Sequence, residues 1–220
     1  MYEEILNDTS YRAMLSACPL FCGLEEPALQ SALTFFEASL NPYKKGDFLQ
    51  EILSPFRHFG LVLEGTVQVY ADDVTGTPII MANVSAGETF GESLCFLEEE
   101  SPVYIRATAS ATVLMLSTGN LHRQPDNPLS LRFTKMLAQR TLTMNDRIQV
   151  LSKRTLREKV LTLLNQYCAR FGHRGFTLPM GRADMAVYLG TDRAALSREL
   201  SRMQKEGLIS FRKNYFLLKI

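Results

Sequence analysis

The chain of 220 residues lacks the long apolar runs of a membrane protein, and its N-terminal stretch MYEEILNDTS is acidic. A membrane helix needs about 20 consecutive apolar residues, and a secretory signal begins with basic residues, so neither is expected. Cysteine is scarce too, because Cys18, Cys22, Cys95 and Cys168 are too few and too scattered for a disulfide framework. The sequence therefore predicts a soluble cytoplasmic protein with reduced thiols.

The sequence also lacks the motifs of several enzyme classes. Metal-dependent oxygenases on barrel folds need clustered His and carboxylate ligands, but the strand-like part of the chain has a single histidine, His58, and no H-x-H pair. There is no G-x-S-x-G and no phosphate-binding glycine loop. We expect no enzyme and no metal site. Two alternatives stay open: a cupin-like enzyme, and a non-catalytic scaffold module whose basic part binds acidic partners.

The net charge of +1 conceals an uneven distribution of charged residues. Residues 1–125 carry 6 Lys and Arg against 16 Asp and Glu, residues 126–150 carry 4 against 2, and residues 151–220 carry 14 against 5. A positive field in one domain suits a polyanion, which the acidic domain would not bind. The alternative is a solvated basic face without a partner.

Residues 40–117 read as a series of short strands. The stretch FGLVLEGTVQVYADD alternates apolar and polar residues, and two similar stretches, TPIIMANVSAGETFGES and YIRATASATVLMLS, follow it. Glycines recur at turn positions, namely Gly46, Gly65, Gly76, Gly87 and Gly91. Short strands punctuated in this way predict an antiparallel barrel or roll. A helical pattern that starts at Glu25–Pro27 precedes it.

From Asp126 the pattern becomes that of one long helix, with Pro128 in its first turn and no interior glycine or proline. Apolar residues follow a 4-4-3-4-3 spacing, with Thr141 in one slot, at Phe133, Leu137, Met144, Ile148 and Leu151. This spacing is typical of a coiled-coil seam. We expect the helix to pair with a second copy across a two-fold axis. Packing on its own chain alone is the alternative.

Residues 153–220 follow the order helix, short strand (GFTLP), helix (RADMAVYL), turn and helix. The short turn contains Gly190, which is the spacing of a helix-turn-helix. Five apolar residues are expected to hold its two helices together: Ala186, Val187, Leu189, Leu196 and Leu200. The final stretch LISFRKNYFLLKI alternates like two strands around RKN and predicts a wing.

The stretch YLGTDRAALSREL suits a helix that reads DNA. Asp192 is a good N-cap, and Arg193 and Ser197 lie one turn apart with Arg198 beside them. In the major groove arginine can bond guanine in a bidentate manner, and serine can contact a base or a phosphate. Backbone contact is expected for Arg182, and nonspecific charge for Arg202, Lys205, Arg212 and Lys213. A surface salt bridge is the alternative for Arg193.

Together these motifs resemble the Crp–Fnr superfamily of bacterial regulators over nearly the whole chain. CPLFCGL is similar to the opening helix of the family, LVLEGTVQVY to a roll strand and AGETFGE to the turn near the effector. VLSKRTLREKVLTLLN is similar to the start of the DNA-binding domain, and YLGTDRAALSREL to the recognition helix.

The resemblance implies an α+β fold with three parts. These are a cyclic-nucleotide-binding-like β-roll (a double-stranded β-helix) over residues 1–125, a dimerisation helix over 126–152 and a winged helix-turn-helix over 153–220. It also implies a homodimeric transcription factor that reads an inverted repeat in double-stranded DNA, with RNA polymerase as a further partner.

The chain departs from the cyclic-nucleotide binders of that family. These carry Glu in the turn and, further along, an Arg–Ser pair that holds the phosphate. Here Gly91 and Glu92 match the turn, but Ser101–Pro102 takes the later position, after three glutamates, Glu98, Glu99 and Glu100. With no arginine and three added carboxylates, a cyclic phosphate would be repelled. The sequence therefore argues against cyclic AMP.

Other cofactors of the family are not expected either. Cys18 and Cys22 form a C-x3-C pair with Cys95 far away, whereas the relatives with an iron–sulfur cluster have a denser N-terminal cysteine run. No haem-ligand position that we can place matches a histidine, whether His58, His122 or His173. The recognition helix has Ala194 where the family often has Glu, which leaves the DNA half-site open.

A small, partly apolar effector other than a cyclic nucleotide is expected in the roll. Its pocket would lie between the turn, the segment after the glutamates, and the facing helix. The candidate lining consists of Gly91, Glu92, Leu94, Ser101, Pro102, Val103, Arg140, Thr141 and Met144. The alternative is a closed roll that binds no ligand.

Overall fold

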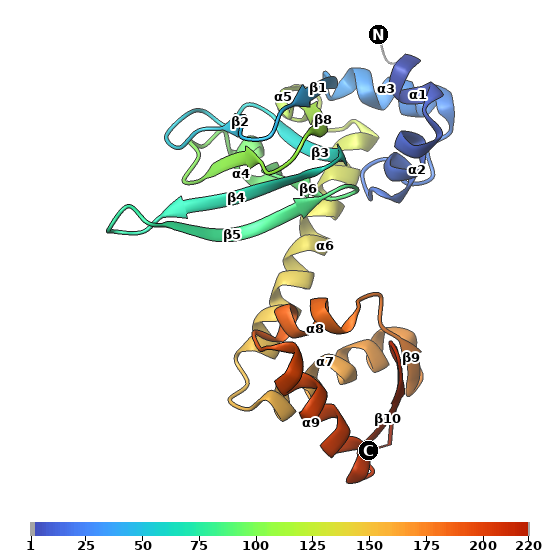
Figure 1. Cartoon of the computed structure of the whole chain (residues 1–220). Helices are drawn as coiled ribbons and strands as arrows, with labels where there is room; N and C mark the ends of the chain where they lie inside the picture. The colour runs from blue at the N-terminus through green and yellow to red at the C-terminus, as the bar shows by residue number, and fades with distance from the viewer. Residues whose placement is uncertain (1–2, 220) are drawn as a thin grey trace. The chain divides into compact units, whose positions relative to one another are not determined.

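The computed structural model describes residues 3–219, with only the backbone given for Glu3 and Glu4. The chain divides into two compact units, Met1–Ala138 and Gln139–Ile220. The boundary falls inside the long helix α6 (Pro128–Leu151), which therefore contributes to both units (Figure 1). The sequence pattern had set this helix apart as a region of its own. None of the helices in the described chain combines the length and hydropathy that a membrane span requires.

The first unit is a β-roll with helices before, between and after its strands. Its helices are α1 (Glu3–Asn7), α2 (Thr9–Ala17), α3 (Glu26–Phe35), α4 (Glu92–Leu97) and α5 (Gly119–Arg123). Its strands are β1 (Ser39–Tyr43), β2 (Phe48–Gln50), β3 (Phe59–Glu64), β4 (Thr66–Asp72), β5 (Pro78–Ser85), β6 (Thr89–Phe90), β7 (Tyr104–Ala107) and β8 (Ala111–Leu116). In the described residues they form two four-stranded antiparallel sheets, ordered β1-β8-β3-β6 and β2-β7-β4-β5. The predicted roll is confirmed.

The start of α6 is part of the core of this roll. Phe133 is 1% exposed, and its ring centroid lies 5.6 Å from that of Phe59, 5.5 Å from Phe96 and 6.4 Å from Phe36. Leu137 is half-buried and packs on the same core. The sequence pattern placed Phe133 on a seam between copies, and this is corrected: the ring is buried in tilted contacts with aromatic rings of its own chain.

Further along α6, the apolar residues of the predicted seam are exposed to solvent. The side chains from Ala138 to Asn145 are all exposed. Large apolar residues are exposed as well, with Met144 at 59%, Ile148 at 60% and Leu151 at 39%. On a helix with 100° per residue, these three share the face that carries Phe133 and Leu137. These five residues form one apolar stripe along α6. Its first part packs in the core of the roll, and its later part is exposed.

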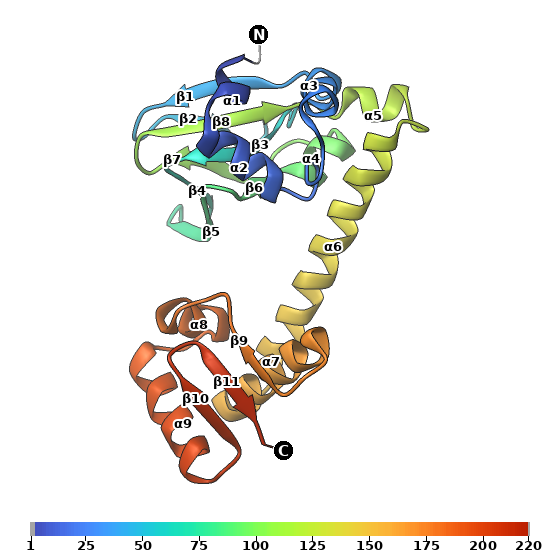
Figure 2. The same ribbon diagram turned by 90° about the vertical axis from the view of Figure 1, so that its right-hand side faces the viewer.

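The second unit contains the end of α6 and a winged helix-turn-helix. Its helices are α7 (Leu156–Phe171), α8 (Arg182–Leu189) and α9 (Arg193–Lys205), and its strands are β9 (Gly175–Thr177), β10 (Ile209–Arg212) and β11 (Tyr215–Leu218). The strands form one small antiparallel sheet in the order β10-β11-β9, which contacts α7 and α9 (Figure 2). Val150 of α6 is fully buried in the core of this unit.

The core between α8 and α9 follows the sequence prediction with one exception. Ala186, Leu189, Leu196 and Leu200 are 0–3% exposed, as their spacing indicates. Val187, which we expected among them, is 72% exposed. It follows Met185 and Ala186, which already occupy the inward face of this short helix, so its side chain points away.

Candidate functional site

The turn between α8 and α9 is built by two local features. Gly190 ends α8 with φ +64, a left-handed conformation that glycine adopts without steric cost. Asp192 then caps α9, because its Oδ1 accepts a hydrogen bond from the backbone N of Ala195 at 2.8 Å. This bond lowers the pKa of Asp192 below its ordinary value. Helix α9 therefore begins at Arg193, directly after its cap.

The outward face of α9 carries the residues that the sequence singled out. Leu196, Leu200 and Met203 are fully buried and define the inner face of the helix. Arg193, Ser197 and Arg198 are all exposed. Further exposed polar residues continue this surface toward the end of the helix, namely Ser201, Arg202 and Lys205.

The hydroxyl of Ser197 is already used as a donor. Its Oγ donates to the carbonyl of Arg193 at 2.8 Å, so its oxygen presents only lone pairs to a ligand. A phosphate oxygen has no proton to give. In this conformation Ser197 can accept from a base amino group but cannot bond a phosphate.

Arg182 connects the start of α8 to the wing formed by β10 and β11. Its guanidinium lies over the rings of Phe211 and Phe216, 5.1 and 5.3 Å from their centroids. Its Nη2 donates to the carbonyl of Lys213 at 3.0 Å, and burial lowers its pKa. Lys213 has φ +54 at the tip of the wing and is exposed. Arg182 thus holds the wing tip. The DNA-backbone contact that we expected for it stays a prediction.

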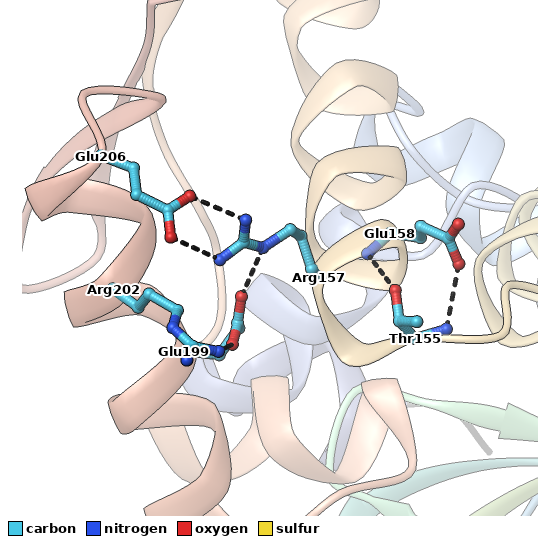
Figure 3. A network of polar contacts seen from close by, with 6 residues as sticks. All are labelled: Thr155, Arg157, Glu158, Glu199, Arg202 and Glu206. Carbon is cyan, nitrogen blue, oxygen red and sulfur yellow. Dashed lines mark hydrogen bonds and ion pairs between the residues drawn. The ribbon is translucent and has the colours of Figure 1, made fainter.

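A second polar network, which the sequence analysis missed, ties α7 to α9 (Figure 3). Arg157 Nε donates to Glu199 Oε1 at 2.7 Å, and its Nη1 and Nη2 donate to the two oxygens of Glu206 at 2.7 and 2.9 Å. At the start of α7, Thr155 and Glu158 form a reciprocal capping box. The T-x-x-E spacing of that box is readable in the sequence, but no local pattern predicts the partners of Arg157.

Two residues of the expected effector region have buried side chains with partners in the roll. Glu92 is 3% exposed and accepts a hydrogen bond from the Thr89 hydroxyl. Ser101 is fully buried, and its Oγ donates to the carbonyl of Val103 at 2.6 Å. The proton of the Ser101 hydroxyl is thus already donated to the backbone of the same segment.

The turn glycine of this region is required by packing. Gly91 has φ +82, and the ring of Phe56, itself 2% exposed, lies where a Cβ would be. Leu94 is half-buried, Val103 is buried and Pro102 is exposed. The other expected lining residues, Arg140, Thr141 and Met144, belong to the second unit and are exposed there.

The described residues do not assemble a metal or cluster site. Among the described residues, no group of three or more His, Cys, Asp or Glu side chains is arranged so that it could hold a metal ion. Cys18 and Cys95 are buried, Cys22 is exposed, and Cys168 is half-buried, and all four are free thiols. Burial raises the pKa of Cys18 and of Cys95. An iron–sulfur cluster requires several thiolates at one place, so the absence of a cluster stays a prediction for this chain.

A β-roll joined through a long helix to a winged helix-turn-helix defines a class of two-domain DNA-binding regulators. Residues 40–125 match the cyclic nucleotide-binding domain family, and residues 158–220 match the Crp-like helix-turn-helix domain family. The chain belongs to the Crp–Fnr superfamily of transcription regulators.

Individual relatives are distant. The transcriptional activator protein anr of Pseudomonas aeruginosa is 28% identical over 77% of this chain and 72% of its own length. Electron transport regulator A of Shewanella oneidensis is 24% identical over 80% of this chain and 73% of its own length. The crystal structure of DNR from Pseudomonas aeruginosa has a TM-score of 0.54 at 22% identity, covers 96% of this chain and 94% of its own, and shows the fold alone. These relatives are regulators and not enzymes, which removes the cupin-like alternative.

Proposed function

We propose that this regulator acts as a homodimer that reads an inverted repeat in double-stranded DNA, with α9 of each subunit in a major groove. The observation that carries the proposal is the exposed face of a capped helix that presents Arg193, Ser197 and Arg198 together. Arginine at the start of such a helix can bond guanine O6 and N7. Beside it, Ser197 in its present conformation would accept from an adenine or cytosine amino group.

Phosphate contacts come from the periphery of this surface. Arg202 and Lys205 near the end of α9, and Arg212 and Lys213 on the wing, are exposed cations. Contacts of this kind place a protein on the duplex without reading sequence. A scaffold module that binds acidic partners would not require these cations to be arranged around the exposed side of a capped helix.

Dimerisation is supported by the exposed part of the α6 stripe. Met144, Ile148 and Leu151 have the spacing of a seam, and no side chain of the described structure buries them. A two-fold dimer would place two recognition helices one turn of DNA, ~34 Å, apart. Site selection from random duplexes tests this directly: we expect a near-palindrome with that spacing. Binding without sequence preference would contradict the proposal and favour a scaffold.

We also propose that cyclic AMP is not the effector of the roll. The segment from Gly91 to Ile105 contains no arginine, and the buried Ser101 hydroxyl is closed onto Val103. Thermal-shift measurements with cyclic AMP and a panel of metabolites, followed by DNA titration for each hit, test this point. We expect no shift with cyclic AMP. A stabilisation that disappears in Glu92→Ala would refute the proposal.

A further inference from the structure

Acidic side chains are unfavourable on a helix that approaches phosphates, because the duplex carries about one negative charge per 1.7 Å. Helix α9 and its two caps nevertheless contain three, Asp192, Glu199 and Glu206. Asp192 is the N-cap, where the helix start stabilises its charge. The other two lie seven residues, or two turns, apart and therefore on one face of the helix.

Both of these glutamates are held by Arg157 of α7. The fork of Arg157 faces Glu206 with two hydrogen bonds, and its Nε bonds Glu199 Oε1. Bidentate arginine–carboxylate pairs are among the stronger polar contacts in proteins. The hydrogen bonds from Arg157 lower the pKa of Glu206 below its ordinary value. Figure 3 shows both carboxylates turned toward Arg157.

Glu199 also has a competing partner on its own helix. Arg202 follows it by three residues, and Arg202 Nη1 lies 3.9 Å from Glu199 Oε2. The Glu199 side chain is 16% exposed, whereas that of Arg202 is 70% exposed. With Oε1 held at 2.7 Å by Arg157, Glu199 makes only a loose contact with Arg202. The cation of Arg202 therefore projects into solvent on the outward side of α9.

We propose that Arg157 is a positioning residue for DNA binding. It keeps Glu199 from forming a close ion pair with Arg202, so that Arg202 stays available to a phosphate. This inference rests on the proposed binding of DNA by α9. Without Arg157, Glu199 would pair with Arg202 in the i, i+3 arrangement that is favourable on helices. Arg157 would thus support binding without touching DNA.

The salt dependence of DNA affinity measures this effect. The slope of log K against log salt is negative, and each phosphate contact adds about 0.9 to its magnitude, which is called the slope below. Arg157→Ala should lower the slope by ~0.9 per subunit, or ~1.8 for two bound subunits. Between 50 and 200 mM salt the unaltered protein should then lose ~12-fold more affinity than the variant. Arg202→Ala should give the same change, and the double variant Arg157→Ala, Arg202→Ala should give no further change in slope.

Rescue distinguishes positioning from a general loss of structure. Arg157→Ala with Glu199→Gln should restore the slope, because the amide has no charge with which to hold Arg202, although it cannot rebuild the link between α7 and α9. Thermal unfolding of each variant checks the fold. If Arg157→Ala does not fold, Arg157→Met, which keeps much of the side-chain volume but removes the charge and every donor, takes its place with the same expected slopes and rescue.

The outcomes are separable. An unchanged slope in the Arg157 variant, or a lowered slope that Glu199→Gln does not restore, overturns the inference while leaving DNA binding intact. Absence of salt-dependent, sequence-specific binding in the unaltered protein would instead refute the proposed function.

Discussion

Replacing Ile148 with aspartate should dissociate the proposed dimer. Ile148 is 60% exposed in the single chain, and complete burial of such a side chain contributes roughly 1.5–3 kcal/mol. The part still to be gained on pairing is therefore roughly 1–2 kcal/mol per side chain, or roughly 2–4 kcal/mol for the two copies. Loss of this term weakens dimerisation roughly 30- to 1000-fold, and a buried, unpaired aspartate weakens it further.

Leu142 supplies a matched control on the same helix. It is 58% exposed, close to the value for Ile148, but it lies two residues from Met144 and therefore roughly 160° away around the helix. Leu142→Asp introduces the same charge without touching the seam, so the dimer should persist. Sedimentation velocity over a range of concentrations compares the two variants. The reasoning is refuted if the unaltered protein is monomeric, or if both variants dissociate equally.

Three further predictions concern the second unit. Arg193→Ala should cost roughly 1–3 kcal/mol in specific binding and relax discrimination at one base, and an unchanged sequence profile in gel-shift titrations would contradict the assignment. Arg182→Ala should weaken binding evenly across sequences and also loosen the wing, which amide hydrogen exchange at residues 209–218 would detect; unaltered exchange would leave only the backbone contact. Asp192→Asn should remove stability that is present above the ordinary aspartate pKa and lost as pH falls through the lowered value, because the folded-state pKa is depressed. Unfolding curves of the two proteins should therefore converge in acid, and a constant difference down to low pH would argue against the charged cap.

The recognition helix and the wing could be predicted because their signals are local. Gly190 and Asp192 fix the turn by backbone conformation and capping, and the burial of Leu196 and Leu200 follows from their spacing. The contacts that hold this region together could not be predicted in the same way. Arg157 and Glu199 are 42 residues apart, and Arg182 and Lys213 are 31 apart. Such pairs meet only after the core has formed.

The long helix shows a different limit. Its 4-4-3-4-3 spacing identifies which face is apolar, but a coiled-coil seam and a core-facing stripe have the same period. The spacing alone therefore could not show that Phe133 packs on Phe59 while Ile148 stays exposed. Helices α1 and α2 were missed because both are short. The cap of α2 at Asp8, which accepts from Ser10 N at 2.7 Å, is its only local signal that we can identify.

The charge asymmetry of the sequence gains a structural explanation in the second unit. Residues 151–220 contain five acidic residues, and each accepts a hydrogen bond within the unit. Three serve helix starts, through Thr155 N to Glu158, Gly181 N to Asp184 and Ala195 N to Asp192. The other two, Glu199 and Glu206, are held by Arg157. Because carboxylates at helix starts and in ion pairs have their charge largely compensated, the exposed arginines and lysines of α9 and the wing dominate the field outside.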